Sequence, residues 1–181
     1  MKEIICLGID PGLANTGYAV VSFCNGQFKL IKGNMIKTNK DHCDALRLRF
    51  ILKCCMTLVD KYEPDYCAAE KFFAAVRVNP KTKKPVFDAN VQKLNQVIGV
   101  ILAACAMNKV EQYSPGTVKK CVGGHGRADK KGVQIGSEKI LCLPEILKPD
   151  HVADAAAHAI TRIMNTPEYA QWEDQQNGIV F

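Results

Sequence analysis

Asp10 ends an apolar segment near the N-terminus and is followed by a Pro-Gly pair, in the run IICLGIDPG. Burying an unpaired carboxylate is unfavourable by several kcal/mol, so Asp10 needs a partner: a basic side chain, backbone N–H groups or a metal ion. Asp-Pro-Gly is also a common turn sequence, and Asp10 can serve that turn alone. Asp10 is therefore a candidate site residue whose partner must come from elsewhere in the chain.

Glu70 repeats this arrangement in the segment YCAAEKFF. The segment is short and apolar and follows a helical pattern, which predicts a strand parallel to the first one. On neighbouring strands, the carboxylates of Asp10 and Glu70 emerge at the same edge of the sheet. Two adjacent carboxylates repel each other unless a cation lies between them. Because oxygen ligands suit Mg²⁺ or Mn²⁺, the pair indicates a divalent-metal site.

A third acidic position lies in the segment PDHVADAAAHAITRIM. This pattern predicts a helix from Asp150 to Met164, with His151 and Asp154 at i and i+3 on one face. The small residues that follow allow the helix to lie close to the sheet, which brings both side chains toward the first two carboxylates. Taken alone, Asp150 or Asp154 can be a capping or helix-dipole residue, and His151 a surface histidine.

The elements that must position these residues follow from periodicity and turn signals. Asn25-Gly26 predicts a hairpin between two of the strands, and helical crossovers make the last two strands parallel to the first. In chain order we predict strands at 4–10, 16–24 and 27–38, a helix at 44–62, a strand at 66–73, a helix at 88–108 and a strand at 110–113. The fold class is therefore α/β, with a five-stranded mixed sheet, three antiparallel strands followed by parallel ones, flanked by helices.

Finer predictions concern the helices. Asp88 is a predicted N-cap, as are Ser114, which is followed by Pro115, and Asp129 before a helix at 130–141. The segment VGGHGRADKKG at 122–132 is Gly-rich and polar, and it predicts a mobile, exposed loop. The helix at 44–62 is predicted to bury one apolar stripe, made of Leu46, Phe50, Cys54 and Leu58.

Composition bounds the class of protein. A chain of 181 residues, 48% of them hydrophobic, predicts about one domain with a real core. No segment approaches the roughly 20 apolar residues of a membrane span, and the N-terminus has no signal-peptide layout, so we expect a cytoplasmic protein without membrane association. The nine cysteines include no C-x-x-C pair, which favours reduced thiols over disulfides or a zinc site.

The net charge of +6 allows an anionic partner without requiring one. Basic residues gather in two segments, RVNPKTKKP at 77–85 and TVKKCVGGHGRADKKG at 117–132. Basic segments of this kind are either solvated surface or contacts for nucleic acid, and composition does not decide between these.

Four segments together resemble the RuvC-type Holliday-junction resolvases, which are crossover-junction endodeoxyribonucleases of the ribonuclease H-like superfamily. The segments are GIDPGLANTGYAVV, AAEKFF, VKKCVGGHGRADKKGVQ and DHVADAAAHAI. Each is weak alone, but in this order and spacing the four are specific, and they span most of the chain. The resemblance implies a ribonuclease H-like nuclease domain at 1–165 and a C-terminal extension at 166–181.

The resemblance also implies roles for individual residues. Asp10, Glu70 and Asp154 match acidic metal ligands, and His151 falls where this family has either aspartate or histidine. Lys119 matches a lysine near the scissile phosphate and joins these four as a predicted catalytic residue. The implied cofactor is Mg²⁺, two ions per site with Mn²⁺ as a substitute, for two-metal hydrolysis that leaves a 5′-phosphate and a 3′-hydroxyl.

DNA contacts are implied at one aromatic position and along the second basic segment. Phe73 matches an aromatic residue that stacks on a base near the cut, whereas Lys71 replaces a glutamine that is frequent in the family, so no cut-site preference is predicted. The segment 77–88 is longer than the family pattern, and we predict that it adds a DNA-contacting loop. The complete set of predicted DNA-binding residues is Phe73, Lys119, Lys120, Arg127, Lys130 and Lys131.

The predicted function is resolution of four-way DNA junctions by paired symmetric nicks, in recombination and repair. Two symmetric cuts favour a two-fold homodimer, with exposed apolar positions of the 88–108 helix as its candidate interface, and a branch-migration helicase is a further candidate partner. Three alternatives remain open: a nuclease of the same superfamily for other branched DNA or RNA/DNA hybrids, a non-catalytic junction-binding protein, and an ATP-using protein of the actin and sugar-kinase type, which shares the D-x-G opening but needs a second phosphate loop.

Overall fold

The computed structural model describes residues 2–71, 77–78, 85–86 and 89–177. Its centre is a five-stranded sheet in the order β3-β2-β1-β4-β7. The strands β1, β2 and β3 are antiparallel, and β4 and β7 run parallel to β1. This confirms the predicted mixed sheet. Its strands are β1 (Ile4–Asp10), β2 (Asn15–Cys24), β3 (Gln27–Lys37), β4 (Tyr66–Glu70) and β7 (Val110–Tyr113).

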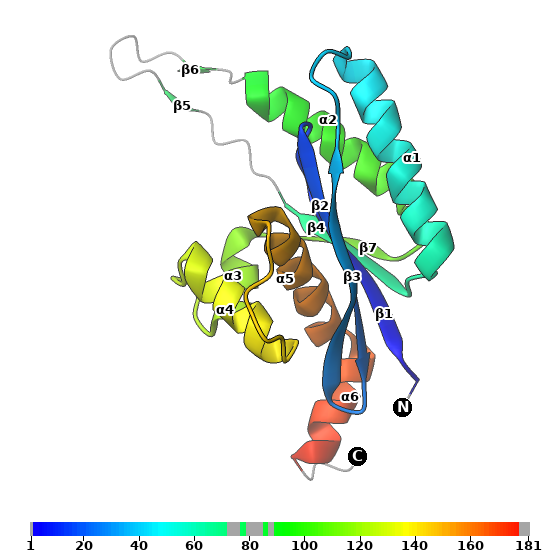
Figure 1. Ribbon diagram of the computed structural model, residues 1–181. Coiled ribbons are helices and arrows are strands. Elements are labelled where there is room, and N and C mark those ends of the chain that lie inside the picture. The colour runs from blue at the N-terminus through cyan, green and yellow to red at the C-terminus, as the bar shows by residue number, and fades with distance from the viewer. Residues whose placement is uncertain (1, 72–76, 79–84, 87–88, 178–181) are drawn as a thin grey trace.

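Helices cover both faces of this sheet (Figure 1). On one face lie α1 (Asp44–Tyr62) and α2 (Ala89–Ala104). On the other lies α5 (Asp150–Met164), with α3 (Pro115–Gly123) and α4 (Lys130–Ile140) packed outside it. Ser114 and Asp129 cap α3 and α4 as predicted, because their side chains accept hydrogen bonds from the backbone N–H groups of Thr117 and Gly132.

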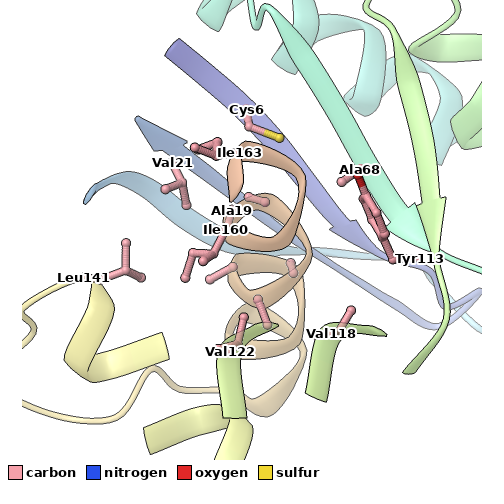
Figure 2. Close-up of a cluster of buried hydrophobic side chains, with 14 of the residues drawn as sticks. Cys6, Ala19, Val21, Ala68, Tyr113, Val118, Val122, Leu141, Ile160 and Ile163 are labelled. Carbon is pink, nitrogen blue, oxygen red and sulfur yellow. The ribbon is translucent and has the colours of Figure 1, made fainter. Parts of the chain in front are cut away.

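The alternation of side chains along the strands divides the core into two layers. Cys6, Ala19 and Val21 point to the α5 side, where they meet Ile160 and Ile163 (Figure 2). Their neighbours in sequence, including Leu7 and Val20, point to the α1–α2 side. Successive strand residues face opposite sides of a sheet, so two helical layers bury both faces.

The turn of the β2–β3 hairpin and the last helix lie next to each other in the fold and complete the core on the α5 side of the sheet. Asn25 and Gly26 have φ values of 48° and 84°, which are the left-handed values of the predicted tight hairpin turn. The helix α6 (Pro167–Gln176) packs Tyr169 and Trp172 against Phe23, with ring centroids 5.1 and 5.4 Å apart. The domain division at residue 165 stays a prediction, and α6 adds its aromatic rings to the core beside the sheet.

The predicted buried stripe of α1 is wrong for its first half, whereas Cys54 and Leu58 do pack against the core. Leu46 and Phe50 are 52% and 48% exposed, and the fully buried positions are instead Ile51 and Cys55, together with Leu58. An α-helix turns about 100° per residue, so residues spaced four apart drift about 40° around the helix at each step. A stripe that starts at Leu46 therefore reaches the buried face only at Leu58.

The predicted mobile, exposed loop at 122–132 is also wrong in part. The helix α3 extends to Gly123 and α4 begins at Lys130, which leaves a short connection between them. Val122 and Ala128 are buried, at 5% and 3% exposure. A polar, Gly-rich segment packs here because these two apolar side chains join the core beneath it.

The basic segment predicted as an added loop contains a two-stranded ladder, β5 (Arg77–Val78) with β6 (Pro85–Val86), separate from the main sheet (Figure 1). The end of the predicted 66–73 strand, Phe73 included, and the predicted cap Asp88 lie outside the described residues. All nine cysteines lie inside them and are free thiols, as predicted. Of the helices that the structure describes, none has the length and apolar character of a membrane span.

Candidate active site

Asp10 and Glu70 lie side by side because they end adjacent parallel strands. The register of β1 and β4 pairs Ile9 with Ala69, so the next residue of each strand is one of the two acids. The side chain of Asp10 is only 13% exposed. The sequence prediction that both carboxylates emerge at one edge of the sheet is confirmed.

The helix α5 brings the second half of the site onto this edge. It lies directly on β1 and β2 because Gly8 and Gly17 carry no side chain: a Cβ at Gly8 would overlap the carbonyl oxygen of Ala155, and one at Gly17 that of His151. At this contact, Nδ1 of His151 lies 2.6 Å from Oδ2 of Asp10, a hydrogen bond between the two side chains. Close backbone packing therefore positions the first turn of α5 over the end of β1.

A cavity of about 200 Å³ opens beside this contact, between the ends of β1 and β4 and the helices α3, α4 and α5. Three of the predicted acidic residues and two of the predicted lysines share its wall: Asp10, Glu70, Asp154, Lys119 and Lys130. These residues come from five different elements, so the tertiary fold gathers them into one place.

Two of the cavity acids, Asp10 and Glu70, have pKa values raised above those of ordinary carboxyl groups. Burial raises the pKa of Glu70, and the nearby charges of Asp10 and Asp154 raise it further. Burial raises the pKa of Asp10 as well, although the hydrogen bond from His151 acts in the opposite direction. Both shifts have one cause, because negative charge is accumulated in a place that water reaches poorly.

Lys130 supplies compensating positive charge. Its Nζ lies 3.2 Å from Oδ2 of Asp150 and 3.3 Å from Oδ2 of Asp154. Partial burial acts to lower the pKa of Lys130, but the hydrogen bond with Asp150 and the charge of Asp154 outweigh it, and the pKa is raised. The same contact lowers the pKa of Asp150. The ammonium group of Lys130 therefore offsets part of the negative charge of Asp150 and Asp154.

The donor chemistry of the cavity fits a hard divalent cation. Carboxylate oxygens are the ligands that Mg²⁺ and Mn²⁺ prefer. Burial and the charges of Asp10 and Asp154 raise the pKa of Glu70, and a cation beside these acids would offset the repulsion. Within the described ranges, no three acidic, histidine or cysteine side chains already converge on one point. A bound cation would therefore have to draw the acids closer together.

The other predicted DNA-binding residues lie around this cavity or beyond the described chain. Lys119 is partly buried on α3 and lines the cavity. Lys120 is exposed on α3, Arg127 is exposed between α3 and α4, and Lys131 is exposed on α4. Phe73 belongs to the residues that the structure does not describe, so its stacking role stays a prediction.

One cavity residue was missed by the sequence analysis. His158 lines the same wall, is 5% exposed, and burial lowers its pKa to about 4. It lies four residues after Asp154 and seven after His151, a spacing that returns to the same face of a helix. This spacing was the available signal, but the apolar, alanine-rich surroundings of His158 favoured a simple core position.

Comparison with known proteins identifies the family of the chain. Residues 6–162 match the family model of the crossover junction endodeoxyribonuclease RuvC. The curated RuvC of Treponema denticola is 37% identical over 159 residues, which cover 87% of this chain and 84% of that protein.

Two solved structures from Thermus thermophilus share the fold. The structure of its RuvC has a TM-score of 0.76 and 28% identity, with coverage of 94% of this chain and 97% of that one. A second, of the same protein in complex with a Holliday junction substrate, also has a TM-score of 0.76, at 24% identity and with coverage of 93% and 96%. The family-model match over residues 6–162, the 37% identity to the T. denticola protein and the shared fold together show that the chain belongs to the RuvC family of crossover junction endodeoxyribonucleases.

Proposed function

We propose that this protein resolves four-way DNA junctions by cutting two strands symmetrically. The observation that carries the proposal is the cavity in which Asp10, Glu70 and Asp154 meet beside Lys119 and Lys130. A protein that only binds DNA gains nothing from carboxylates that face phosphate, whereas a nuclease can use them to hold cations. Family membership and the T. thermophilus RuvC in complex with a Holliday junction support the choice of substrate.

The acidic residues and His151 are the side chains that would hold Mg²⁺, two ions per site, or Mn²⁺ in its place. When bound, such ions would supply the positive charge that activates a water for attack on the phosphorus and stabilises the leaving 3′ oxygen, and the products would carry a 5′-phosphate. Lys119 would place its ammonium beside the phosphate and offset the charge that develops there. His151, through its 2.6 Å hydrogen bond, holds Asp10 at the end of β1.

The DNA would approach across α3 and α4. Lys120, Arg127 and Lys131 are exposed there, next to the cavity, and suit contacts to the phosphate backbone. Phosphate entering the cavity would compete with Asp150 and Asp154 for Lys130, so substrate binding would free both acids from their ion pairs. The DNA contact of the 77–88 segment, which contains β5 and β6, stays a prediction, as do the cytoplasmic location and the helicase partner.

Two symmetric cuts require two sites, and we propose a two-fold homodimer. Its interface is best supplied by α1, where Leu46 and Phe50 are 52% and 48% exposed. The 88–108 helix first favoured for this role ends earlier, as α2, in which the described side chains include no exposed large apolar one; Met107, within the predicted range but beyond α2, is 94% exposed. The helices α1 and α2 lie on the face of the sheet opposite to α5, so a dimer formed there leaves both cavities open (Figure 1).

The deciding experiment compares a mobile four-way junction, a linear duplex, a flap and an RNA/DNA hybrid, each with and without Mg²⁺. We expect paired symmetric nicks in the junction alone, and only with the metal. Cutting of the hybrid or the flap would favour another nuclease of the superfamily, and binding without any cutting would favour a junction-binding protein.

The matched variant is Asp10→Asn, which removes one charge and leaves the shape of the side chain. We expect it to abolish cleavage while junction affinity, measured by electrophoretic mobility shift, stays within a few-fold of wild type. A variant that still cuts the junction would contradict the assignment of Asp10 to the metal site.

A further inference from the structure

The turn at 11–14 joins β1 to β2 directly after Asp10. Pro11 at its start has no N–H to donate, and the ladder between the two strands ends at the pair of Asp10 with Gly17. The register with β4 ends one residue earlier, at Ile9. Since Asp10 is the last residue of its strand, its side chain follows any movement of the turn. The direction of the Asp10 carboxylate therefore depends on what holds the turn.

Thr38 binds two carbonyl oxygens of this turn. Its hydroxyl donates to the carbonyl oxygen of Leu13 at 2.6 Å, and its backbone N–H donates to that of Ala14 at 3.0 Å. The hydroxyl of Thr16 binds the carbonyl oxygen of Gly12 in the same way, at 2.7 Å. Three consecutive carbonyl oxygens of the turn are thereby held. Because Thr38 follows the end of β3, it ties the turn to a distant part of the chain.

Arg47 of α1 fixes the hydroxyl of Thr38. Its Nε donates a hydrogen bond of 2.9 Å to Oγ1 of Thr38, which leaves the hydroxyl proton for the carbonyl oxygen of Leu13. The side chain of Arg47 is only 12% exposed, and its Nη1 lies 3.3 Å from Oδ1 of Asp44 in the first turn of the helix. Hydrogen bonds from a charged donor are stronger than neutral ones. A chain of polar contacts therefore runs from α1 through Thr38 to the turn beside Asp10.

We propose that Arg47 and Thr38 are positioning residues for the reaction, which hold the turn so that the carboxylate of Asp10 keeps its direction in the cavity wall. The proposal rests on the proposed function and deepens it, because Asp10 is a metal ligand there. Among the described residues that line the cavity, neither Arg47 nor Thr38 is present, so both act through the turn. Loss of a contact that supports a ligand commonly lowers activity by about 10- to 100-fold.

The test compares Thr38→Val, which removes the hydroxyl and keeps the shape of the side chain, with Thr38→Ser, which keeps the hydroxyl. Single-turnover cleavage of a four-way junction in saturating Mg²⁺, at a temperature where every variant is folded, should be about 10- to 100-fold slower in Thr38→Val. Thr38→Ser should restore most of the rate. Junction affinity should stay within a few-fold of wild type in both variants, because the turn positions a ligand and does not bind the DNA.

Thr57→Val is the matched control. The hydroxyl of Thr57 also donates to a backbone carbonyl oxygen, that of Lys53 at 2.9 Å, but the contact lies within α1. We expect this variant to cut at the wild-type rate. If Thr38→Val does not fold, Arg47→Gln replaces it and should slow cleavage in the same direction, because it removes the charged donor to Thr38.

The second readout needs no catalysis: the NMR order parameters of the backbone N–H groups of Leu13 and Ala14 in the metal-free protein. We expect about 0.85 in wild type and Thr38→Ser, and below about 0.6 in Thr38→Val. Unchanged order parameters, a wild-type rate in Thr38→Val or an equally slow Thr38→Ser would overturn the positioning role and leave the proposed function standing. If the wild type cuts no junction, the proposed function is overturned, and the order parameters alone decide whether Thr38 holds the turn.

Discussion

At the residue scale, the ionised carboxylate of Glu70 lowers the stability of the folded chain. Its pKa is raised by burial and by the charges of Asp10 and Asp154, so its ionised form is less favourable in the folded chain than in the unfolded one. Active sites commonly hold charged groups that lower the free energy of unfolding, and a bound ligand raises it again. The cavity acids are therefore expected to couple stability to pH and to metal.

Replacing Glu70 by glutamine should stabilise the metal-free protein at pH 7. The folded pKa of Glu70 lies above its ordinary value of 4.5, so the wild type loses stability as the pH rises through that range, and the variant does not. In EDTA we expect Tm to rise by about 2–4 °C at pH 7, with no gain near pH 3. The exposed Glu145→Gln is the control. A variant that is less stable than wild type at pH 7 would contradict this account.

Replacing His158 by leucine should remove an acid-sensitive part of stability. The unfolded chain binds a proton at this histidine below about pH 6.5, but burial delays protonation in the fold until about pH 4. Wild-type stability therefore falls over this window, by on the order of 3 kcal/mol, and the variant escapes that loss. Urea unfolding in EDTA at pH 7, 5.5 and 4 measures the free energy of unfolding of both proteins. If the difference in this free energy between wild type and variant stays constant with pH, the prediction is wrong.

At the scale of elements, the site depends on how closely α5 approaches the sheet. Gly8 and Gly17 remove the side chains that would separate the helix from β1 and β2, and a buried apolar stripe then anchors α5 along its length. This contact sets the 2.6 Å hydrogen bond between His151 and Asp10. A displacement of the helix would therefore disturb the chemistry before it unfolded the protein.

Gly17→Ala should destabilise the fold by about 1–3 kcal/mol, because the added methyl group meets the rigid backbone of α5 at His151. The rate of junction cleavage should fall even at temperatures where the variant is still fully folded. Gly99→Ala is the matched control: it lies in α2, its new methyl group has nothing within 4 Å, and it should stabilise by up to about 1 kcal/mol. Thermal melts of both variants measure the contrast, and equal effects would contradict the close-contact explanation.

At the scale of the whole molecule, the two faces of the sheet have different tasks. One face carries α5 and the basic helices α3 and α4, and the other carries α1 and α2 (Figure 1). The cavity lies on the α5 side, between the ends of β1 and β4 and the helices α3, α4 and α5. An exposed ion pair between Lys93 and Asp44, 3.0 Å long, links α2 to α1. Buried side chains hold the two helices on the sheet: Ile51, Cys55, Val97 and Ile101. The exposed apolar residues of α1 then form a surface suited to a second copy of the chain.

Phe50→Asp should convert the proposed dimer into a monomer, because a charge would be buried at its interface. Sedimentation equilibrium at micromolar concentration gives the mass directly. Met107→Asp is the control, since Met107 is 94% exposed and lies beyond the end of α2. Equal masses for the wild type and Phe50→Asp would exclude this interface.

Local sequence patterns were sufficient to predict much of the fold and part of the site. The strand order followed from hairpin and crossover rules, and the acids Asp10 and Glu70 could be paired because both end adjacent parallel strands. The caps Ser114 and Asp129 were equally predictable, since a cap is a contact between residues three apart. The face of α1 that is buried could not be predicted in this way, because it depends on contacts with the sheet and with α2.

What the sequence by itself determined was the five strands of the main sheet, the caps of α3 and α4 and the edge on which the acids gather. Only the tertiary structure placed Nδ1 of His151 on Asp10, Lys130 between two aspartates, and His158 in the wall of the cavity. These contacts join residues of different elements, some of them far apart in the chain. Their existence depends on how closely the helices pack on the sheet, and periodicity along a single element does not encode that distance.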